Sequence, residues 1–411
     1  MSGDIIAATL DVRSSSNIGS RRLLAGDLGE ATFSLRQGSI RLLEQGAEKE
    51  RYYGTCSYGK TIWNPSNVAV VGPIQLDCKG KVPGLAFPLD FDAASKCGAA
   101  EQMYWNQAVE SFGRQLAAND NKLRAVLQWP ERRRIMTILP QEVTCPWYGL
   151  AETSCSKSTC FSYIHGKATS NVYTIFHELQ HNHGLQHAGW MSAEYGDQTD
   201  PMGSSPEGSS GPHCHNAASN WRIGWATPMP GGDLTAASFT PNSNRLRFMI
   251  PASGRTDQNM VIVNLGLQSS SPGAASISYP KYFLSYRVRN KTYGGYDAGL
   301  SDSFHQKVLV HNYNGTITDR DVTTKTWLIA SAGTINTGPR FDAFDPAFGA
   351  RNIWTGPFVP YNAATGLGGG LRIKVVSVGD TSAEVEVCRM YSQTEGAPGS
   401  PDCMANMDRD W

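Results

Sequence analysis

The segment from His177 to His187 constrains this chain more than any other, because it reads H-E-x-x-H-x-x-G-x-x-H. Residues four apart on a helix share one face, so His177 and His181 can bind the same ion. Gly184 can adopt the left-handed conformation that ends a helix, and the resulting turn brings His187 back as a third ligand. Three histidines with an open fourth position are typical of a catalytic zinc site rather than a structural one.

The residues around these histidines fit a rigid helix that carries a catalytic group. Glu178 lies beside the first histidine and can reach a metal-bound water without binding the metal, so we assign it as the general base. Ser170 or Thr169 can cap the helix, and His183 is expected to be a bystander that points to another face. An apolar stripe at helical spacing predicts the buried side of the helix: Val172, Ile175, Phe176 and Leu179.

A second motif follows His187, in the order Asp200-Pro201-Met202-Gly203-Ser204, and its methionine lies fifteen residues after that histidine. A methionine in a tight turn shortly after the third histidine belongs to the extended form of this zinc motif. We therefore expect the Met202 thioether to form an apolar floor beneath the histidines without binding the metal.

These motifs resemble the metzincin metallopeptidases, and within them the gametolysin-like (autolysin) peptidases of volvocine green algae. Two departures from the family stand out: many members have Gln where this chain has His177, and Ser204 occupies the place of a tyrosine ligand found in some metzincins. The similarity covers roughly Tyr53 to Trp225. It is carried by His187-Ala188-Gly189-Trp190, Met202-Gly203, Cys145-Pro146-Trp147-Tyr148-Gly149-Leu150 and the segment from Cys214 to Trp225.

The resemblance implies a zinc-dependent endopeptidase that acts on extracellular-matrix or cell-wall glycoproteins rich in hydroxyproline. It also implies that an extended substrate pairs with an edge strand near Phe161–Ile164, and that Trp221 or Trp225 contributes to the wall of the substrate pocket. One zinc ion is the expected cofactor. A calcium ion is a further expectation that no sequence motif supports.

The pattern of apolar and polar residues along the chain predicts an α+β fold in three parts. Residues 1–50 are interpreted as a prodomain remnant or N-terminal extension, and residues 51–228 as a metzincin-type domain of a twisted mixed sheet plus helices. An amphipathic helix is expected over Ala99–Ala118, with Met103, Trp105, Val109, Phe112 and Leu116 on its core face. Beyond a linker near Pro228, short β-rich runs without helical periodicity predict an all-β, sandwich-like domain over 229–411.

Composition excludes several partners. Lys+Arg and Asp+Glu are both 36, so neither nucleic acid nor an anionic membrane surface is indicated. No apolar run approaches the roughly 20 residues that a membrane span requires.

Several features indicate export to the extracellular matrix or cell wall. Nine cysteines favour disulfides and an oxidising compartment. We expect a staple among Cys145, Cys155 and Cys160 and a pair of Cys388 with Cys403, and Cys56 either binds zinc in a latent proenzyme or is structural. One feature conflicts with export: the start Met1-Ser2-Gly3-Asp4 shows no signal peptide. Either the start is truncated, which we expect, or export uses another route, or the protein stays inside the cell. Two glycosylation acceptors agree with export: Asn290-Lys291-Thr292 and Asn314-Gly315-Thr316.

The sequence thus predicts a metalloendopeptidase in which Glu178 activates a zinc-bound water. Two alternatives stay open: a catalytically silent zinc-binding structural or wall-interaction protein, and a zinc hydrolase that acts on non-peptide bonds. Glu178 argues against the first alternative, because a scaffold has no use for a base.

Overall fold

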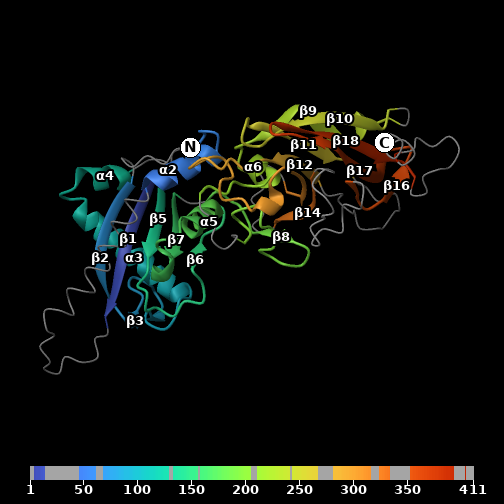
Figure 1. Cartoon of the computed structure of the whole chain (residues 1–411). Coiled ribbons are helices and arrows are strands. Elements are labelled where there is room, and N and C mark those ends of the chain that lie inside the picture. The colour runs from blue at the N-terminus through green and yellow to red at the C-terminus, as the bar shows by residue number, and fades with distance from the viewer. Residues whose placement is uncertain are drawn as a thin grey trace, which may run out of the picture. The chain divides into compact units, whose positions relative to one another are not determined.

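The chain folds into two compact units in which strands predominate over helices among the described residues (Figure 1), which confirms the α+β class. The N-terminal unit comprises Met1–Gly54 with Lys60–Leu185, and the C-terminal unit comprises Thr55–Gly59 with Gln186–Trp411. No helix in the part of the chain that the structure describes is long and apolar enough to cross a membrane. The computed structural model describes residues 4–13, 46–61, 68–128, 133–155, 158–204, 211–240, 243–266, 281–315, 324–333, 352–392 and 403.

The N-terminal unit is built on a mixed sheet with the strand order β2-β1-β5-β7-β6. The first four strands are parallel neighbours, and β6 pairs antiparallel with β7 at the edge. The edge strand next to α5 is therefore β6, whereas the sequence analysis placed it near Phe161–Ile164. The strands are β1 (Asp4–Arg13), β2 (Val68–Asp77), β5 (Arg133–Ile138), β6 (Gly149–Ala151) and β7 (Thr159–Ile164).

Strand β1 is an interior strand of this sheet, with Ile6 opposite both Ala69 of β2 and Ile135 of β5. Residues 1–50 were expected to be a prodomain remnant or extension, yet residues 4–13 contribute to the central sheet. The strands predicted over 31–35 and 40–43 lie outside the described residues.

Helices pack on the sheet as their apolar spacing requires. The predicted amphipathic helix forms α3, whose Trp105 and Val109 are buried in the core of the unit. Met103 and Leu116, which were predicted on the same face, are 37% and 41% exposed, because their positions rotate off the buried stripe. The described helices of this unit are α2 (Gly46–Cys56), α3 (Ala99–Leu116), α4 (Asn121–Leu127) and α5 (Val172–Asn182), and a hairpin is formed by β3 (Lys79–Lys81) and β4 (Asp90–Asp92).

The C-terminal unit consists of two sheets that share one hydrophobic core. Val261, Leu284 and Val310 of one sheet and Ile373 and Val385 of the other are all part of this core. The shared core favours the interpretation as a sandwich. One sheet has the order β8-β14-β13-β12-β11-β9, and the other has β10-β18-β17-β15 with β16 paired to β17.

The bounds of these elements are as follows. The first sheet contains β8 (Ala188–Trp190), β9 (Thr227–Thr235), β11 (Gln258–Asn264), β12 (Lys281–Arg287), β13 (Lys307–Tyr313) and β14 (Thr326–Gly333). The second contains β10 (Arg245–Pro251), β15 (Ile353–Thr355), β16 (Val359–Asn362), β17 (Leu367–Val378) and β18 (Ser382–Met390), and α6 spans Ala217–Arg222.

The units divide between Leu185 and Gln186, whereas the sequence analysis expected a boundary near Pro228. The physical reason is that the segment after the third histidine forms its hydrogen bonds with the β-rich part of the chain. Strand β8 pairs in parallel with β14, with Ala188 opposite Thr326. The predicted linker at Pro228 lies inside β9, which pairs with β11.

Four disulfides connect eight of the nine cysteines. Cys56 pairs with Cys214, which corrects its predicted alternative as a zinc-binding cysteine of a latent form. Cys145 pairs with Cys97, and Cys155 pairs with Cys160, so the predicted staple consists of two separate bridges. The predicted pair of Cys388 with Cys403 is confirmed.

One buried guanidinium joins the irregular segments of the C-terminal unit. Arg287, at the end of β12, forms an ion pair with Asp297 and donates to the carbonyl oxygens of Thr199 at 3.0 Å and Cys214 at 2.9 Å. Arg287 and Asp297 are at most 1% exposed, so neither charge can exchange its partner for water. We infer that this pair is required for folding of the unit.

We predict that Arg287→Met lowers the free energy of unfolding by about 3–5 kcal/mol, because it leaves the Asp297 carboxylate buried without its partner. Lys291→Gln is the matched control, since Lys291 pairs with Asp302 at 3.5 Å and their side chains are 66% and 68% exposed. Loss of such a surface pair costs about 0–1 kcal/mol. Urea unfolding measures both, and similar losses in the two variants would contradict the role assigned to Arg287.

Candidate metal centre

Helix α5 carries the first two histidines of the motif. Its N-cap is Asn171, whose side-chain oxygen accepts hydrogen bonds from the backbone N–H groups of Tyr173 and Thr174. The cap was predicted at Ser170 or Thr169 instead, one or two residues too early. Three of the four predicted stripe residues are buried: Ile175, Phe176 and Leu179. The helix packs against β6 and β7, which fixes the face that presents the histidines.

His177 and His181 lie on one face of α5, as their spacing predicts. Their ring centroids are 4.8 Å apart in an edge-on arrangement, and both side chains are buried. The Nδ1 atom of His181 lies 2.8 Å from the backbone oxygen of Leu185. Because a carbonyl oxygen only accepts, Nδ1 carries the proton and Nε2 is left with a lone pair for a metal.

The turn after α5 leads to His187. Gly184 has a φ of 92°, the left-handed conformation that the motif predicts. His187 donates from Nδ1 to the Glu194 carboxylate at 2.6 Å, and Lys325 donates to the same carboxylate oxygen at 2.8 Å. Burial lowers the pKa of His187, although the Glu194 carboxylate acts in the opposite direction. The ring is thus oriented so that Nε2 is the atom that could bind a metal.

The three histidines of the motif could hold one metal ion. Each offers one ring nitrogen, and these nitrogens all lie within 4.8 Å of one another. Three neutral imidazoles suit zinc among the common biological metals. His183 is not part of this group, as expected, and its Nε2 lies 3.3 Å from Nη2 of Arg134.

Glu178 is buried on α5 between the two histidine positions, at 6% exposure. Burial raises the pKa of its carboxyl group to about 8 in the absence of a nearby cation. A cation beside the carboxylate would favour the charged form and lower this pKa. Such a group can exchange a proton near neutral pH, as a general base must.

The position of Glu178 depends on Gly149 of β6. A Cβ atom at residue 149 would lie 2.6 Å from Cγ and 2.7 Å from Cδ of Glu178, closer than non-bonded atoms approach. The edge strand and the carboxylate can therefore pack together only because residue 149 has no side chain. Gly149 is thus a positioning residue for the predicted base.

The predicted methionine turn is present. Gly203 donates from its N–H to the oxygen of Asp200 at 2.9 Å, and Met202 is fully buried. The Asp200 carboxylate accepts from the N–H of Met202 at 2.7 Å and of Asn216 at 2.7 Å, and lies 3.0 Å from Nδ1 of His215. The buried Asp200 carboxylate thus fixes the conformation of the turn. The role of Met202 as an apolar floor beneath the histidines stays a prediction.

The two tryptophans predicted at the substrate pocket differ in exposure. Trp225 is 3% exposed and its ring centroid lies 5.4 Å from that of His215, so burial disfavours contact with a substrate. Trp221 is partly exposed and packs on Phe283, with the Lys281 ammonium 5.4 Å from its ring centroid. A pocket role stays a prediction, and Trp221 is the better placed of the two.

Sequence reasoning missed Gly149, Glu194 and Lys325. Nothing in the sequence distinguishes Glu194 or Lys325 from the other charged residues, because Lys325 bonds to Glu194 across 131 positions of the chain and only through Glu194 supports His187. Gly149 lies in the segment from Cys145 to Leu150 that resembles the family, but only the packing of β6 on α5 gives it a role.

Residues 41–335 match the sequence model of a family described as gametolysin peptidase M11. The chain is 39% identical to the autolysin of Chlamydomonas reinhardtii over 385 residues, which cover 82% of this chain and 58% of that protein. The chain therefore spans somewhat over half the length of this relative. The range matched by the family contains the three histidines, Glu178 and Met202.

We predict that Gly149→Ala lowers the free energy of unfolding by about 1–3 kcal/mol, the usual cost of inserting a methyl group into a filled site. In a Glu178→Ala background the same change should cost less than half as much, because the carboxylate that the methyl group meets is gone. Urea unfolding of the four proteins in this cycle measures the coupling.

Gly54→Ala is the matched control, since a Cβ atom there meets nothing within 4 Å. Equal costs of Gly149→Ala in both backgrounds would show that β6 moves aside and does not press on Glu178.

We also predict that Glu194→Ala weakens zinc binding by about 10–100-fold, the range found when a carboxylate behind a histidine ligand is lost. Lys325→Met should have a smaller effect in the same direction, because Lys325 only holds Glu194. Competition with a chelator of known affinity measures both. Glu384→Ala is the control, since Glu384 pairs with Arg247 at 3.5 Å and with no histidine; an unchanged affinity of Glu194→Ala would remove Glu194 from the site.

Proposed function

The chain belongs to the gametolysin peptidase M11 family, and on this basis we propose that it is a zinc-dependent endopeptidase of cell-wall or extracellular-matrix proteins. The observation that carries the proposal is the group of three histidine nitrogens within 4.8 Å of one another, next in sequence to a buried glutamate. Each element of this group has a chemical task in peptide hydrolysis.

The histidines would hold the metal through the nitrogens that their other contacts leave available. The Leu185 carbonyl occupies Nδ1 of His181, and the Glu194 carboxylate occupies Nδ1 of His187, so both rings present Nε2. When bound, zinc supplies a Lewis acid that lowers the pKa of water toward about 7 and polarises a carbonyl group.

Glu178 performs the proton transfers in this proposal. Its carboxylate takes a proton from the attacking water and returns it to the amine that leaves when the peptide bond breaks. Burial raises the pKa of this carboxyl group to about 8, and a cation bound beside it would lower the pKa and favour the ionised form. Burial also excludes bulk water from the proton path.

Strand β6 is the proposed docking edge for an extended substrate. The backbone oxygen of Tyr148 accepts from the N–H of His165, and the backbone N–H of Glu152 donates to the backbone oxygen of Phe161. Because hydrogen-bonded positions alternate along an antiparallel pair, the N–H and C=O groups of Gly149 and Ala151 point away from β7. A substrate strand could pair with these groups in an antiparallel sense. The position of β6 against α5 would then bring the peptide bond to the metal side of Glu178.

The substrate class rests on the relative named autolysin and on the family resemblance. We propose glycoproteins of the cell wall or extracellular matrix, including hydroxyproline-rich ones, and a site of action outside the cell. Four disulfides agree with an oxidising compartment. The buried carboxyl group of Glu178 argues against a silent scaffold, because burying it unpaired costs stability without benefit to a scaffold.

We predict that Glu178→Gln retains zinc but loses turnover by about 10²–10⁴-fold, since it removes the base and leaves the ligands in place. His187→Ala should instead lose zinc, while His183→Ala, which alters a histidine outside the triad, should keep both metal and activity. Metal analysis and mass-spectrometric mapping of cut sites in a wall glycoprotein measure these outcomes. Turnover of Glu178→Gln within tenfold of the unaltered protein would assign the base elsewhere.

A further inference from the structure

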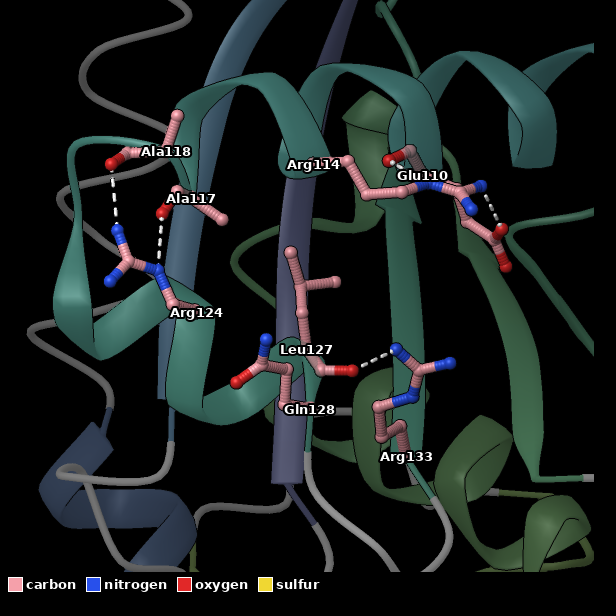
Figure 2. A pocket seen from close by; sticks show the side chains of 8 residues that line it. All are labelled: Glu110, Arg114, Ala117, Ala118, Arg124, Leu127, Gln128 and Arg133. Atoms are coloured by element: carbon pink, nitrogen blue, oxygen red, sulfur yellow. Dashed lines mark hydrogen bonds and ion pairs between the residues drawn. The ribbon is translucent and has the colours of Figure 1, made fainter.

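A hollow of about 440 Å³ lies at the ends of helices α3 and α4 in the N-terminal unit, and Figure 2 shows three arginine side chains around it. None of the metal-site residues lines it, so it serves a different purpose from the candidate metal centre. Its lining consists of Glu110, Arg114, Ala117, Ala118, Arg124, Leu127, Gln128 and Arg133.

Two of the arginines are held in place by backbone oxygens. Arg124 donates to the oxygens of Ala117 at 3.0 Å and Ala118 at 2.7 Å, at the end of α3. Arg133 of β5 donates to the oxygen of Leu127 at the end of α4, at 2.5 Å. Figure 2 shows both sets of bonds at the rim of the hollow. Their side-chain conformations are therefore fixed before any ligand arrives, which lowers the entropic cost of binding.

The third arginine is anchored only within its own helix and reaches no helix end. Arg114 donates from Nε to the backbone oxygen of Glu110 at 3.2 Å and pairs with the Glu110 carboxylate at 2.7 Å, and its side chain is 69% exposed. Capping of helix ends accounts for Arg124 and Arg133 but not for a third guanidinium beside them. An exposed pair of this kind contributes little to stability, so Arg114 is free to serve another interaction.

The charges around the hollow do not cancel. Three guanidinium groups face one carboxylate, that of Glu110, and the two helix ends contribute about half a negative charge each. About one net positive charge remains, in a chain whose formal net charge is zero. Each guanidinium also has five N–H donors, more than its protein acceptors use here.

We propose that this hollow is a binding site for a small molecule or terminal group that carries an oxyanion, namely a carboxylate, sulfate or phosphate. Guanidinium forks match the paired oxygens of all three groups. The volume accommodates a ligand larger than the bare anion, of the size of an acidic sugar or a phosphorylated small molecule. Because only one excess charge is present and the Arg114 side chain is exposed, we expect binding to be weak and to decrease as the salt concentration rises.

The test is thermal unfolding of the full chain with increasing sodium sulfate or sodium phosphate, at ionic strength held constant with sodium chloride. A parallel arm compares sodium glucuronate with glucose, which separates a carboxylate ligand from a tetrahedral oxyanion. Peptidase activity is not measured, so the result is independent of the proposed function.

Two substitutions with opposite expected effects on anion binding make the test specific. Arg114→Gln removes a guanidinium group without changing the hydrogen bonds at the helix ends. We expect half-saturation to require an anion concentration about threefold to tenfold higher. Glu110→Gln removes the opposing carboxylate, and we expect binding to strengthen by a similar factor. Lys122→Gln is the matched control: it removes one positive charge from an exposed position of α4 that does not line the hollow, and should leave binding unchanged.

Saturable stabilisation that shifts in opposite directions in Arg114→Gln and Glu110→Gln supports the site. A response that does not saturate, or that is the same in Arg114→Gln as in the unaltered chain, would overturn it and leave only a general salt effect.

Discussion

The buried guanidinium of Arg287 organises the part of the C-terminal unit that has the least regular structure. The described residues between β8 and α6, 191–204 and 211–216, contain turns, and their backbone groups need partners that neither a helix nor one of the named sheet strands supplies. Arg287 satisfies the oxygens of Thr199 and Cys214 while its charge is balanced by Asp297. One side chain from β12 thus fixes the approach to the methionine turn and the cysteine that binds Cys56.

A set of buried polar side chains extends this arrangement. Asp200 fixes the turn around Met202, and Asp197 lies 3.1 Å from His311 of β13 and 3.2 Å from the amide of Asn216. Buried carboxylates are tolerated here because each accepts several hydrogen bonds. The segment after the third histidine is therefore held in place by side chains of the β strands of the C-terminal unit. These strands help to determine the conformation of the methionine turn.

The candidate metal centre differs from these stabilising contacts, because its buried carboxyl group lowers the stability of the folded chain. Glu178 is buried with its pKa raised by desolvation, and Gly149 has to lack a side chain so that β6 can pack against it. Such a carboxyl group weakens the folded state, and it becomes useful only beside a cation. His181 and His187, the candidate ligands, already donate from Nδ1 to Leu185 and Glu194, so they would need little rearrangement to bind a cation.

The sequence by itself determined the features that depend on neighbours along the chain. The spacing of His177 and His181 places both rings on one helix face, Gly184 takes the left-handed turn, and helix α3 follows its apolar period, because these are properties of local backbone geometry. Only the tertiary structure decided the contacts between distant segments: the bond of Cys56 to Cys214, β1 inside the sheet, Gly149 under Glu178, and Lys325 behind Glu194 and His187. The boundary at Leu185 belongs to the same class, since it follows from the pairing of β8 with β14. The spacing of residues along the chain does not indicate which distant strand or charged side chain will pack against them. Those contacts depend on burial and hydrogen bonding over the whole unit.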